Sequence, residues 1–257
     1  MNKKRIRAIA LSAILSAGLA GCIPQELSAD VSNVAILTTN DEETGKTLNQ
    51  GVAQEKDIQG EKFKLSIHYL SGEDTWRITS NKKLYFEIKT LNLPDNLAVY
   101  IDNIHMDTSI VSTKAAFDGI MQDTMDDRIH NSLMLGFPID NERSYFGVNE
   151  IEGQNDSFIS GYSYGNAYYH GGSVYQRRYL ESDYLKDGVW ANKVDVVIDL
   201  LICDKTTGEV LRQVSVDSNL LIEVNDKVTF LEKGDYVTYD YDRDGSKKEI
   251  KRVKKND

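Results

Sequence analysis

The stretch VDVVIDLLICDKTTGEVLRQVSV, residues 194–216, decides the fold class of this chain. Apolar side chains recur there at every second position, and one face carries Val194, Val196, Ile198, Leu200 and Ile202. Period-two alternation is typical of a β-strand with one buried face. The segment Thr206-Thr207-Gly208 then predicts a turn into a second strand over residues 210–216. These residues therefore predict a long antiparallel strand pair.

The same alternation recurs on both sides of this pair. It predicts further strands over residues 63–69, 84–89, 97–101, 220–224, 236–241 and 249–253. Turn residues stand between strands, as in Pro94-Asp95-Asn96 and in Asp244-Gly245. Strands do not alternate with helices, so a parallel α/β sheet is not expected. The pattern predicts an all-β domain over residues 61–257, an antiparallel β-sandwich that is immunoglobulin-like in general layout.

One segment of this domain predicts a short helical insertion. Its apolar residues fall near helical spacing, and Ser112 or Thr113 can cap its start. These residues are Phe117, Ile120, Met121, Met125 and Ile129. Gly119 weakens the pattern because glycine lowers helix stability.

Composition and charge narrow the class of protein. Of the 257 residues, 40% are apolar and 27% charged, as in ordinary globular proteins. The formal net charge of −10 makes nucleic acid a poor partner. Two cysteines and three prolines exclude a disulfide scaffold and a proline-rich fibre. Cys203 lies within the apolar strand pattern, and we expect it to be a buried small hydrophobe.

The N-terminus has the pattern of an export signal. Lys3, Lys4, Arg5 and Arg7 precede an apolar run over residues 8–17. That run is shorter than the ~20 residues of a membrane span and fits the core of a signal peptide. It leads into Leu19-Ala20-Gly21-Cys22. The segment resembles the signal of bacterial lipoproteins, whose lipobox has an aliphatic residue, two small residues and a cysteine.

This resemblance implies a cellular location for the protein. Residues 1–21 would be removed as the signal peptide, and Cys22 would become the new N-terminus, bearing a diacylglyceryl group with fatty acyl chains such as palmitate. Two acyl chains hold a protein on a membrane where one is marginal. The expected location is the cell membrane, lipid-anchored on its extracytoplasmic face. The polar composition of residues 22–60 predicts a flexible tether between anchor and sandwich.

Basic residues gather at the C-terminal end of this acidic chain. They are Lys247, Lys248, Lys251, Arg252, Lys254 and Lys255. One interpretation is a solvated edge strand whose lysines oppose aggregation. The other is a patch that contacts phospholipid or an acidic wall polymer.

Seven of the 14 tyrosines lie within 23 residues. They are Tyr162, Tyr164, Tyr168, Tyr169, Tyr175, Tyr179 and Tyr184, interspersed with glycine and serine. This composition is typical of recognition loops, and the first five are candidate ligand-binding residues for a glycan or a peptide. The alternative is a strand pair whose rings pack on their neighbours.

The segment Asp240-Tyr241-Asp242-Arg243-Asp244-Gly245 begins like a calcium-binding loop. Oxygen ligands at alternate positions and a glycine at the sixth suit Ca²⁺, so Asp240, Asp242 and Asp244 are candidate ligands. The twelfth position holds Lys251 where such loops have a glutamate. A plain Asp-Gly hairpin turn is the alternative.

Other clusters offer weaker signals. His105, Asp107, Asp123, Asp126, Asp127 and His130 lie within 26 residues, without the spacing of a zinc motif. In that cluster, Asp126 and His130 would share a face if their segment is helical. Asp195 and Asp199 lie on one strand face and could form the carboxylate pair of a glycosidase. Ser163 lies in a G-x-S-x-G pattern, but no helix pattern follows it and His170 is the only later histidine.

The sequence thus predicts a lipid-anchored extracytoplasmic lipoprotein that acts as a non-enzymatic binding or structural module, without a cofactor. Two alternatives remain. One is a cell-envelope hydrolase using paired carboxylates, and the other is a calcium-stabilised adhesion module.

Overall fold

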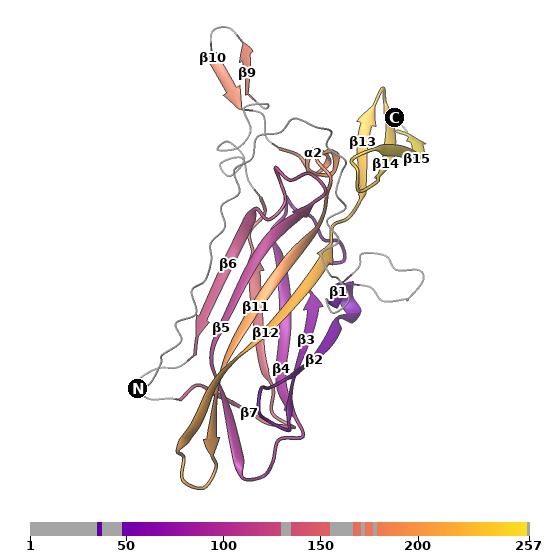
Figure 1. Ribbon diagram of the computed structural model, residues 1–257. Coiled ribbons are helices and arrows are strands. Elements are labelled where there is room, and N and C mark those ends of the chain that lie inside the picture. The colour runs from indigo at the N-terminus through magenta and orange to yellow at the C-terminus, as the bar shows by residue number, and fades with distance from the viewer. Residues whose placement is uncertain are drawn as a thin grey trace, which may run out of the picture. The chain divides into compact units, whose positions relative to one another are not determined.

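Two β-sheets packed together form the body of the protein (Figure 1). The computed structural model describes residues 35–37, 48–129, 135–154, 167–170, 173–176 and 179–255. The strands are almost all antiparallel and do not close into a barrel. The predicted all-β class and antiparallel sandwich are therefore confirmed.

The larger sheet has six strands in the order β1-β12-β11-β5-β6, with β7 also paired to β5. Its strands are β1 (Ala35–Leu37), β5 (Leu97–Ser112), β6 (Met121–Arg128), β7 (Phe137–Ile139), β11 (Val189–Asp204) and β12 (Val210–Glu223). The opening stretch of sequence forms most of β11 and the first half of β12, and the two pair antiparallel as predicted. β1 is the exception, because it runs parallel to β12.

The smaller sheet has four strands in the order β2-β3-β4-β8. They are β2 (Val52–Asp57), β3 (Lys64–Ser71), β4 (Lys82–Leu91) and β8 (Tyr145–Ile151). The two sheets are also joined by hydrogen bonds, since the fully buried Tyr69 of β3 donates from its Oη to Ser218 Oγ of β12 at 2.9 Å.

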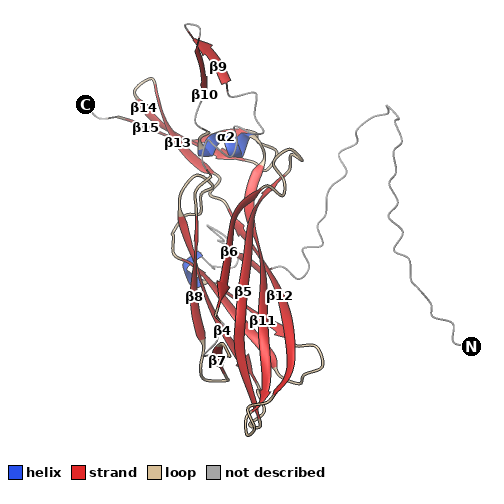
Figure 2. Ribbon diagram, turned by 90° about the vertical axis from the view of Figure 1, so that its left-hand side faces the viewer, coloured by secondary structure: helices blue, strands red, loops and turns tan. Residues whose placement is uncertain are grey.

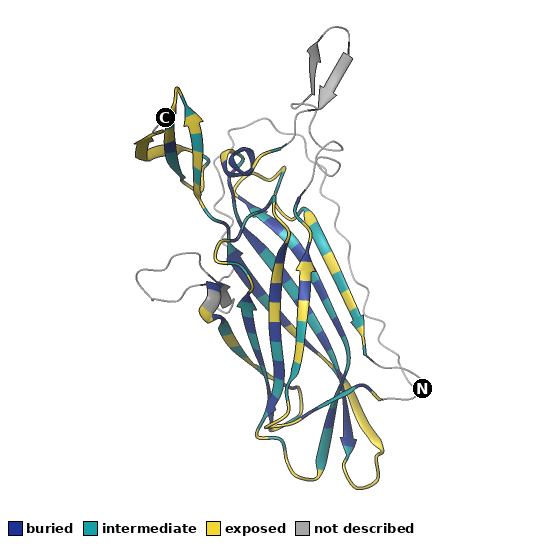
Figure 3. Cartoon of the chain, turned by 180° about the vertical axis from the view of Figure 1, so that it is seen from behind, coloured by how far each residue is buried: buried dark blue, intermediate teal, exposed yellow. Residues whose placement is uncertain are grey.

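The core lies between the inward faces of these sheets. Burial alternates along β3, β5 and β11, as the banded strands of Figure 3 show. Val194, Val196 and Ile198 of β11 are at most 1% exposed. Each such side chain contributes about 1.5–3 kcal/mol when removed from water, which explains why the alternation fixes the register.

Shorter elements complete the described chain (Figure 2). They are the 3-10 helix η2 (Leu48–Gln50), the helix α2 (Glu181–Lys186), the hairpin β9 (Ala167–His170) and β10 (Ser173–Gln176), and a three-stranded sheet of β13 (Lys227–Glu232), β14 (Asp235–Tyr241) and β15 (Lys247–Lys254). Lys247–Lys254 forms the edge of that sheet and is exposed throughout.

The helix predicted around residues 117–129 is wrong. Residues 121–128 form β6, which pairs antiparallel with β5, with Met125 opposite Met106. Met125 and Ile129 pack against the core. They stand four residues apart, a spacing that fits one face of a strand as well as a helix turn. The single α-helix of the described residues is α2 instead.

The predicted tether also extends too far along the chain. Residues 52–57, assigned to it, form β2 of the smaller sheet, and residues 35–37 pair with β12. Leu37, Leu48 and Ile58 are each at most 2% exposed. Sparse apolar residues in a polar segment were enough to anchor these strands, because their neighbours supply most of the core.

Candidate functional site

The tyrosine-rich segment is described only in part. Tyr162, Ser163 and Tyr164 lie outside the described residues. Tyr168 and Tyr175 are cross-strand partners in the β9–β10 hairpin, and Tyr169 is opposite Val174. The hairpin agrees with the predicted strand pair, and its role in ligand binding stays a prediction.

The last two tyrosines of this cluster serve packing. The rings of Tyr179 and Tyr184 meet edge to face, with centroids 5.0 Å apart. Tyr179 also stacks on Phe117 at 6.2 Å and donates a hydrogen bond to Asp187. These contacts hold α2 against the loop that precedes β6.

The predicted His–Asp cluster is divided between the two faces of β6. On the outer face, His105 lies 3.2 Å from Asp107 and 3.7 Å from Asp126. The strand directs Asp127 to the other side, where it accepts a hydrogen bond from Tyr145 Oη at 2.5 Å. His130 lies outside the described residues, and the helix face expected for Asp126 and His130 does not exist. No three metal-ligating side chains meet within the part of the chain that the structure describes.

The carboxylate pair of the hydrolase alternative does not form. Asp195 and Asp199 share the outer face of β11 but stand four residues apart, about 13 Å along a strand. Glycosidases need about 5–9.5 Å. Each carboxylate has another partner: Asp195 pairs with Lys193 at 2.8 Å, and Asp199 accepts from Ser215 Oγ at 2.5 Å.

The candidate calcium loop is a hairpin turn between β14 and β15. Asp242 accepts from Ser246 Oγ at 3.1 Å, and Asp244 accepts from the Ser246 N–H at 2.8 Å. Gly245 has a φ of +88°, and a Cβ there would lie 2.2 Å from the carbonyl oxygen of Lys186. Among the described residues, Asp240 does not join the other two carboxylates in a metal-sized group. The geometry is that of the alternative Asp-Gly turn.

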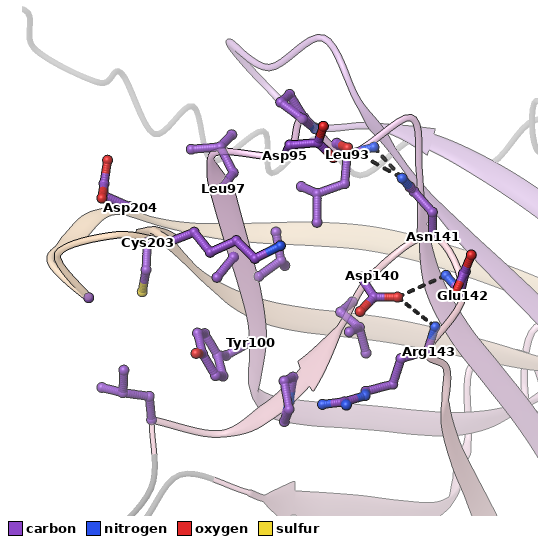
Figure 4. A pocket seen from close by; sticks show the side chains of 18 residues that line it. Leu93, Asp95, Leu97, Tyr100, Asp140, Asn141, Glu142, Arg143, Cys203 and Asp204 are labelled. Atoms are coloured by element: carbon purple, nitrogen blue, oxygen red, sulfur yellow. Dashed lines mark hydrogen bonds between the residues drawn. The ribbon is translucent and has the colours of Figure 1, made fainter.

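A hollow of about 580 Å³ lies at the end of the sandwich where β5 begins and β11 ends (Figure 4). Tyr100 stands on β5, and Arg143 belongs to the facing loop after β7. Leu97, Pro138 and Ile139 add apolar lining. The charged residues around the hollow are Asp95, Asp140, Glu142, Arg143, Asp204 and Lys205. Its volume falls within the range of about 300–1,000 Å³ that is typical of small-ligand sites, and its surface is more polar than apolar.

Hydrogen bonds fix the loops that enclose this hollow. Asp140 accepts from the N–H groups of Glu142 and Arg143 at 2.8 and 2.7 Å, which Figure 4 shows as dashed lines. Asp204 accepts in the same way from Thr206 and Thr207. These backbone donors stabilise the carboxylates and hold the pKa of Asp140 and of Asp204 below its ordinary value. Both side chains therefore stay ionised and act as loop braces.

The loop before β7 approaches β5 closely enough to require glycine. Gly136 has a φ of +128°, and a Cβ there would lie 2.1 Å from the carbonyl oxygen of Ile101. Only glycine adopts this backbone without strain. Its approach places Leu135 and Pro138 on the wall of the hollow.

Cys203 also lines this hollow and is only 1% exposed. Burial raises the pKa of its thiol, so the thiol stays protonated at neutral pH. The predicted buried small hydrophobe is what the structure contains.

A buried polar network at the other end of β11 was missed from the sequence. The fully buried Asn192 accepts from Trp76 Nε1 at 2.8 Å and donates to Ser109 O and to Gln122 Oε1. Nearby, Glu181 of α2 accepts from the N–H of Ile78 at 2.8 Å. These bonds tie α2 and the loop before β4 to the larger sheet.

Lys82 belongs to the same end and is 2% exposed. Its Nζ contacts the carbonyl oxygens of Ile78 and Ser80 at 3.5 and 3.3 Å and lies 5.4 Å from the Trp76 ring. Burial lowers the pKa of Lys82 to about 8, against the opposing charges of Glu181 and Asp123. A sequence signal existed, because Lys82 and Asn192 each continue the buried phase of their strand, before Leu84 and before Val194.

Comparison with known proteins does not identify a family for this chain. No family model matches the chain, and no curated protein matches it. Two solved structures align with part of it: a Bacteroides uniformis beta-glucuronidase (9% identity, TM-score 0.25) and Bacteroides uniformis beta-glucuronidase 2 covalently bound to cyclophellitol-6-carboxylate aziridine (7% identity, TM-score 0.22). Each alignment covers 67% of this chain and only 14% of the glucuronidase chain. A likeness of this size carries no argument about activity.

Proposed function

We propose that this protein is a lipoprotein, anchored through diacylglyceryl-Cys22 on the extracytoplasmic face of the cell membrane, whose β-sandwich is a non-enzymatic binding module. The observation that carries the binding role is the braced hollow of about 580 Å³ between β5, β7 and the β11–β12 turn. A site that is already formed costs little conformational entropy when a ligand binds.

The lining favours a short peptide as the ligand. Leu97, Tyr100 and Pro138 offer apolar contact, while the rim carries both charge signs, with Arg143 and Lys205 against Asp95 and Glu142. A peptide has apolar side chains, charged groups and backbone hydrogen bonds that can use all of these. A neutral glycan would leave the charges of the rim without partners.

The lowered pKa of two carboxylates in the hollow also fits a binding role better than a catalytic one. A general acid needs a carboxyl whose pKa is raised toward the working pH. The pKa of Asp140 and of Asp204 is lowered instead, by backbone donors. Both carboxylates stabilise loops and are poorly suited to give up a proton.

The mode of attachment rests on the sequence of residues 1–22. Cys22 follows an aliphatic and two small residues at the end of a short apolar run. Within the described ranges, no helix combines the length and apolar character that a membrane crossing needs. Acyl chains on Cys22 would hold the protein at the bilayer with ~0.8 kcal/mol per buried methylene.

The binding role is tested by nuclear magnetic resonance with two defined probes. A synthetic tetrapeptide with two leucines and a free carboxylate should shift the amide signals of residues 97–100 and 138–143. The double variant Arg143→Gln/Lys205→Gln should weaken this binding about tenfold, because it removes charge-assisted contacts. Arg77→Gln, outside the hollow, is the control. Shifts with chitotriose alone would make the ligand a glycan, and no shifts with either probe would overturn the hollow as the site.

The anchor is tested by labelling cells with radioactive palmitate. The wild-type chain should take up label and fractionate with membranes, whereas Cys22→Ala should do neither. An unlabelled wild-type protein that is well expressed would overturn the anchor and leave the binding role to its own test.

A further inference from the structure

The three-stranded sheet of β13, β14 and β15 has two unlike faces. One carries aromatic rings, and we call it the ring face: Phe230, Val237, Tyr239 and Tyr241. The other carries lysines and an apolar row, and we call it the lysine face: Lys227, Leu231, Tyr236, Lys248, Lys251 and Val253. Alternation along each strand separates the two sets.

On the ring face, two cations have partners within the sheet. Lys247 Nζ lies 3.7 Å from the centroid of the Tyr239 ring. Arg252 pairs with Glu249 at 2.7 Å and with Asp235 at 3.5 Å. Val237 is fully buried on this side. Lys247 and Arg252 are therefore both engaged by groups of the same sheet.

On the lysine face, the apolar side chains form one row across all three strands. Leu231 is opposite Tyr236, which is opposite Val253. The three are 56%, 45% and 46% exposed. A contiguous row of exposed apolar side chains marks a candidate interaction surface.

The lysines beside this row have no ion-pair partner among the described residues. Lys227, Lys248 and Lys251 form no salt bridge there, although Asp240 lies opposite both Lys227 and Lys248 in the register. The sheet is also basic as a whole. Residues 227–255 have nine Lys and Arg against six Asp and Glu, in a chain whose net charge is −10.

We propose that the lysine face docks on the surface of an anionic phospholipid bilayer. Lysines are attracted to the anionic headgroups, and the row of Leu231, Tyr236 and Val253 enters the boundary between headgroups and acyl chains, where tyrosine and aliphatic side chains are favoured. A soluble polyanion would use the lysines but leave the apolar row in water, so the bilayer fits both features. The contact comes from this sheet alone and does not depend on acylation of Cys22.

The experiment is vesicle co-sedimentation of an unacylated chain that starts at residue 22 and carries Cys22→Ser. This chain keeps every residue that the structure describes. We expect binding to vesicles of phosphatidylcholine with about 30% phosphatidylglycerol, whose headgroup is anionic, and none to pure phosphatidylcholine. Lys227→Gln/Lys248→Gln/Lys251→Gln should weaken the binding roughly 100-fold, since each lysine near an anionic surface contributes about fivefold.

Two further variants separate the causes. Lys56→Gln/Lys62→Gln/Lys89→Gln changes the net charge equally elsewhere in the chain and should bind as wild type. Leu231→Ser/Val253→Ser keeps every charge and should weaken binding to vesicles but not to soluble dextran sulfate. Equal loss of vesicle binding in both triple lysine variants would overturn the lysine face as the docking surface, because binding would then depend on net charge alone. Wild-type vesicle binding unchanged by Leu231→Ser/Val253→Ser would overturn the bilayer as the occupant in favour of a polyanion, and absence of vesicle binding would overturn the proposal itself.

Discussion

The two ends of the sandwich use the same hydrogen-bonding groups in opposite surroundings. At the open end, Asp140 and Asn141 hold the loops around the hollow and are exposed. At the closed end, Glu181 and Asn192 bind backbone and side-chain groups and are 7% and 0% exposed. When an exposed hydrogen bond is removed, water bonds to the remaining group and little free energy is lost. A buried donor left without a partner has no water to bond to, so the protein loses the full desolvation cost of that donor. Hydrogen bonds at the closed end should therefore contribute more to stability than those at the open end, around the proposed ligand site.

The largest expected effect follows from removing the carboxylate of the closed end. Glu181 accepts from Ile78 N–H at 2.8 Å, from Thr79 N–H at 3.0 Å and from Thr79 Oγ1 at 2.7 Å. Glu181→Ala leaves these donors without an acceptor and should lower the free energy of unfolding by about 4 kcal/mol. Glu181→Gln, which keeps one acceptor oxygen, should cost about half as much. Urea unfolding at pH 7 measures both, and a loss in Glu181→Ala no larger than in the exposed Glu142→Ala would refute the contrast between the ends.

The two asparagines give a matched pair for the same contrast. Asn192 joins Trp76, Ser109 and Gln122 inside the protein. Asn141 binds the backbone N–H of Leu93 at 2.8 Å in an exposed position. Asn192→Ala should lower the free energy of unfolding by about 3 kcal/mol and Asn141→Ala by under about 1 kcal/mol, because water replaces only the exposed bonds. Equal losses from the two variants would show that burial does not set the cost.

Much of the fold could be predicted from the sequence because alternation is a local signal. Alternation predicts the buried face of Val194, Val196 and Ile198 without knowledge of the neighbouring strands. The dipeptide Asp244-Gly245 likewise predicts a turn. The helix prediction around Met125 was wrong because the four-residue spacing from Met125 to Ile129 fits both a helix and a strand. Only the pairing with β5 decides between the two. The edge strand β2 was missed because its half-exposed face carries little apolar signal.

The candidate site and the buried network depend on contacts between residues distant in the sequence, which no local pattern contains. The hollow joins residues 93–100, 135–143 and 203–208, and its boundaries are set by how three loops meet. The closed end joins Trp76 to Asn192 across 116 positions. The local sequence signal for this end is a polar residue at a buried position of a strand, as at Lys82 and Asn192. That signal does not identify the residue's hydrogen-bond partner.

The smallest of the three effects concerns the pH dependence of stability at Lys82. Burial lowers the pKa of its ammonium to about 8 in the folded state, whereas in the unfolded chain the pKa keeps its ordinary value of 10.5. Between these values the unfolded state binds the extra proton, so the free energy of unfolding rises with pH. Relative to Lys82→Met, the wild-type protein should gain about 2 kcal/mol between pH 8 and pH 10.

Taking the difference between the two proteins cancels every other group that titrates in this range, including the tyrosines. Lys83→Met is the control, because Lys83 is exposed and pairs with Glu150 at 2.7 Å. Its contact raises the pKa of Lys83, so its contribution to stability is present below the ordinary lysine pKa and declines only above it. The difference for Lys83→Met should therefore stay flat between pH 8 and pH 10, as measured by urea unfolding. A flat difference for Lys82→Met as well would mean that water reaches Lys82 and that this end of the sandwich is less closed than its packing indicates.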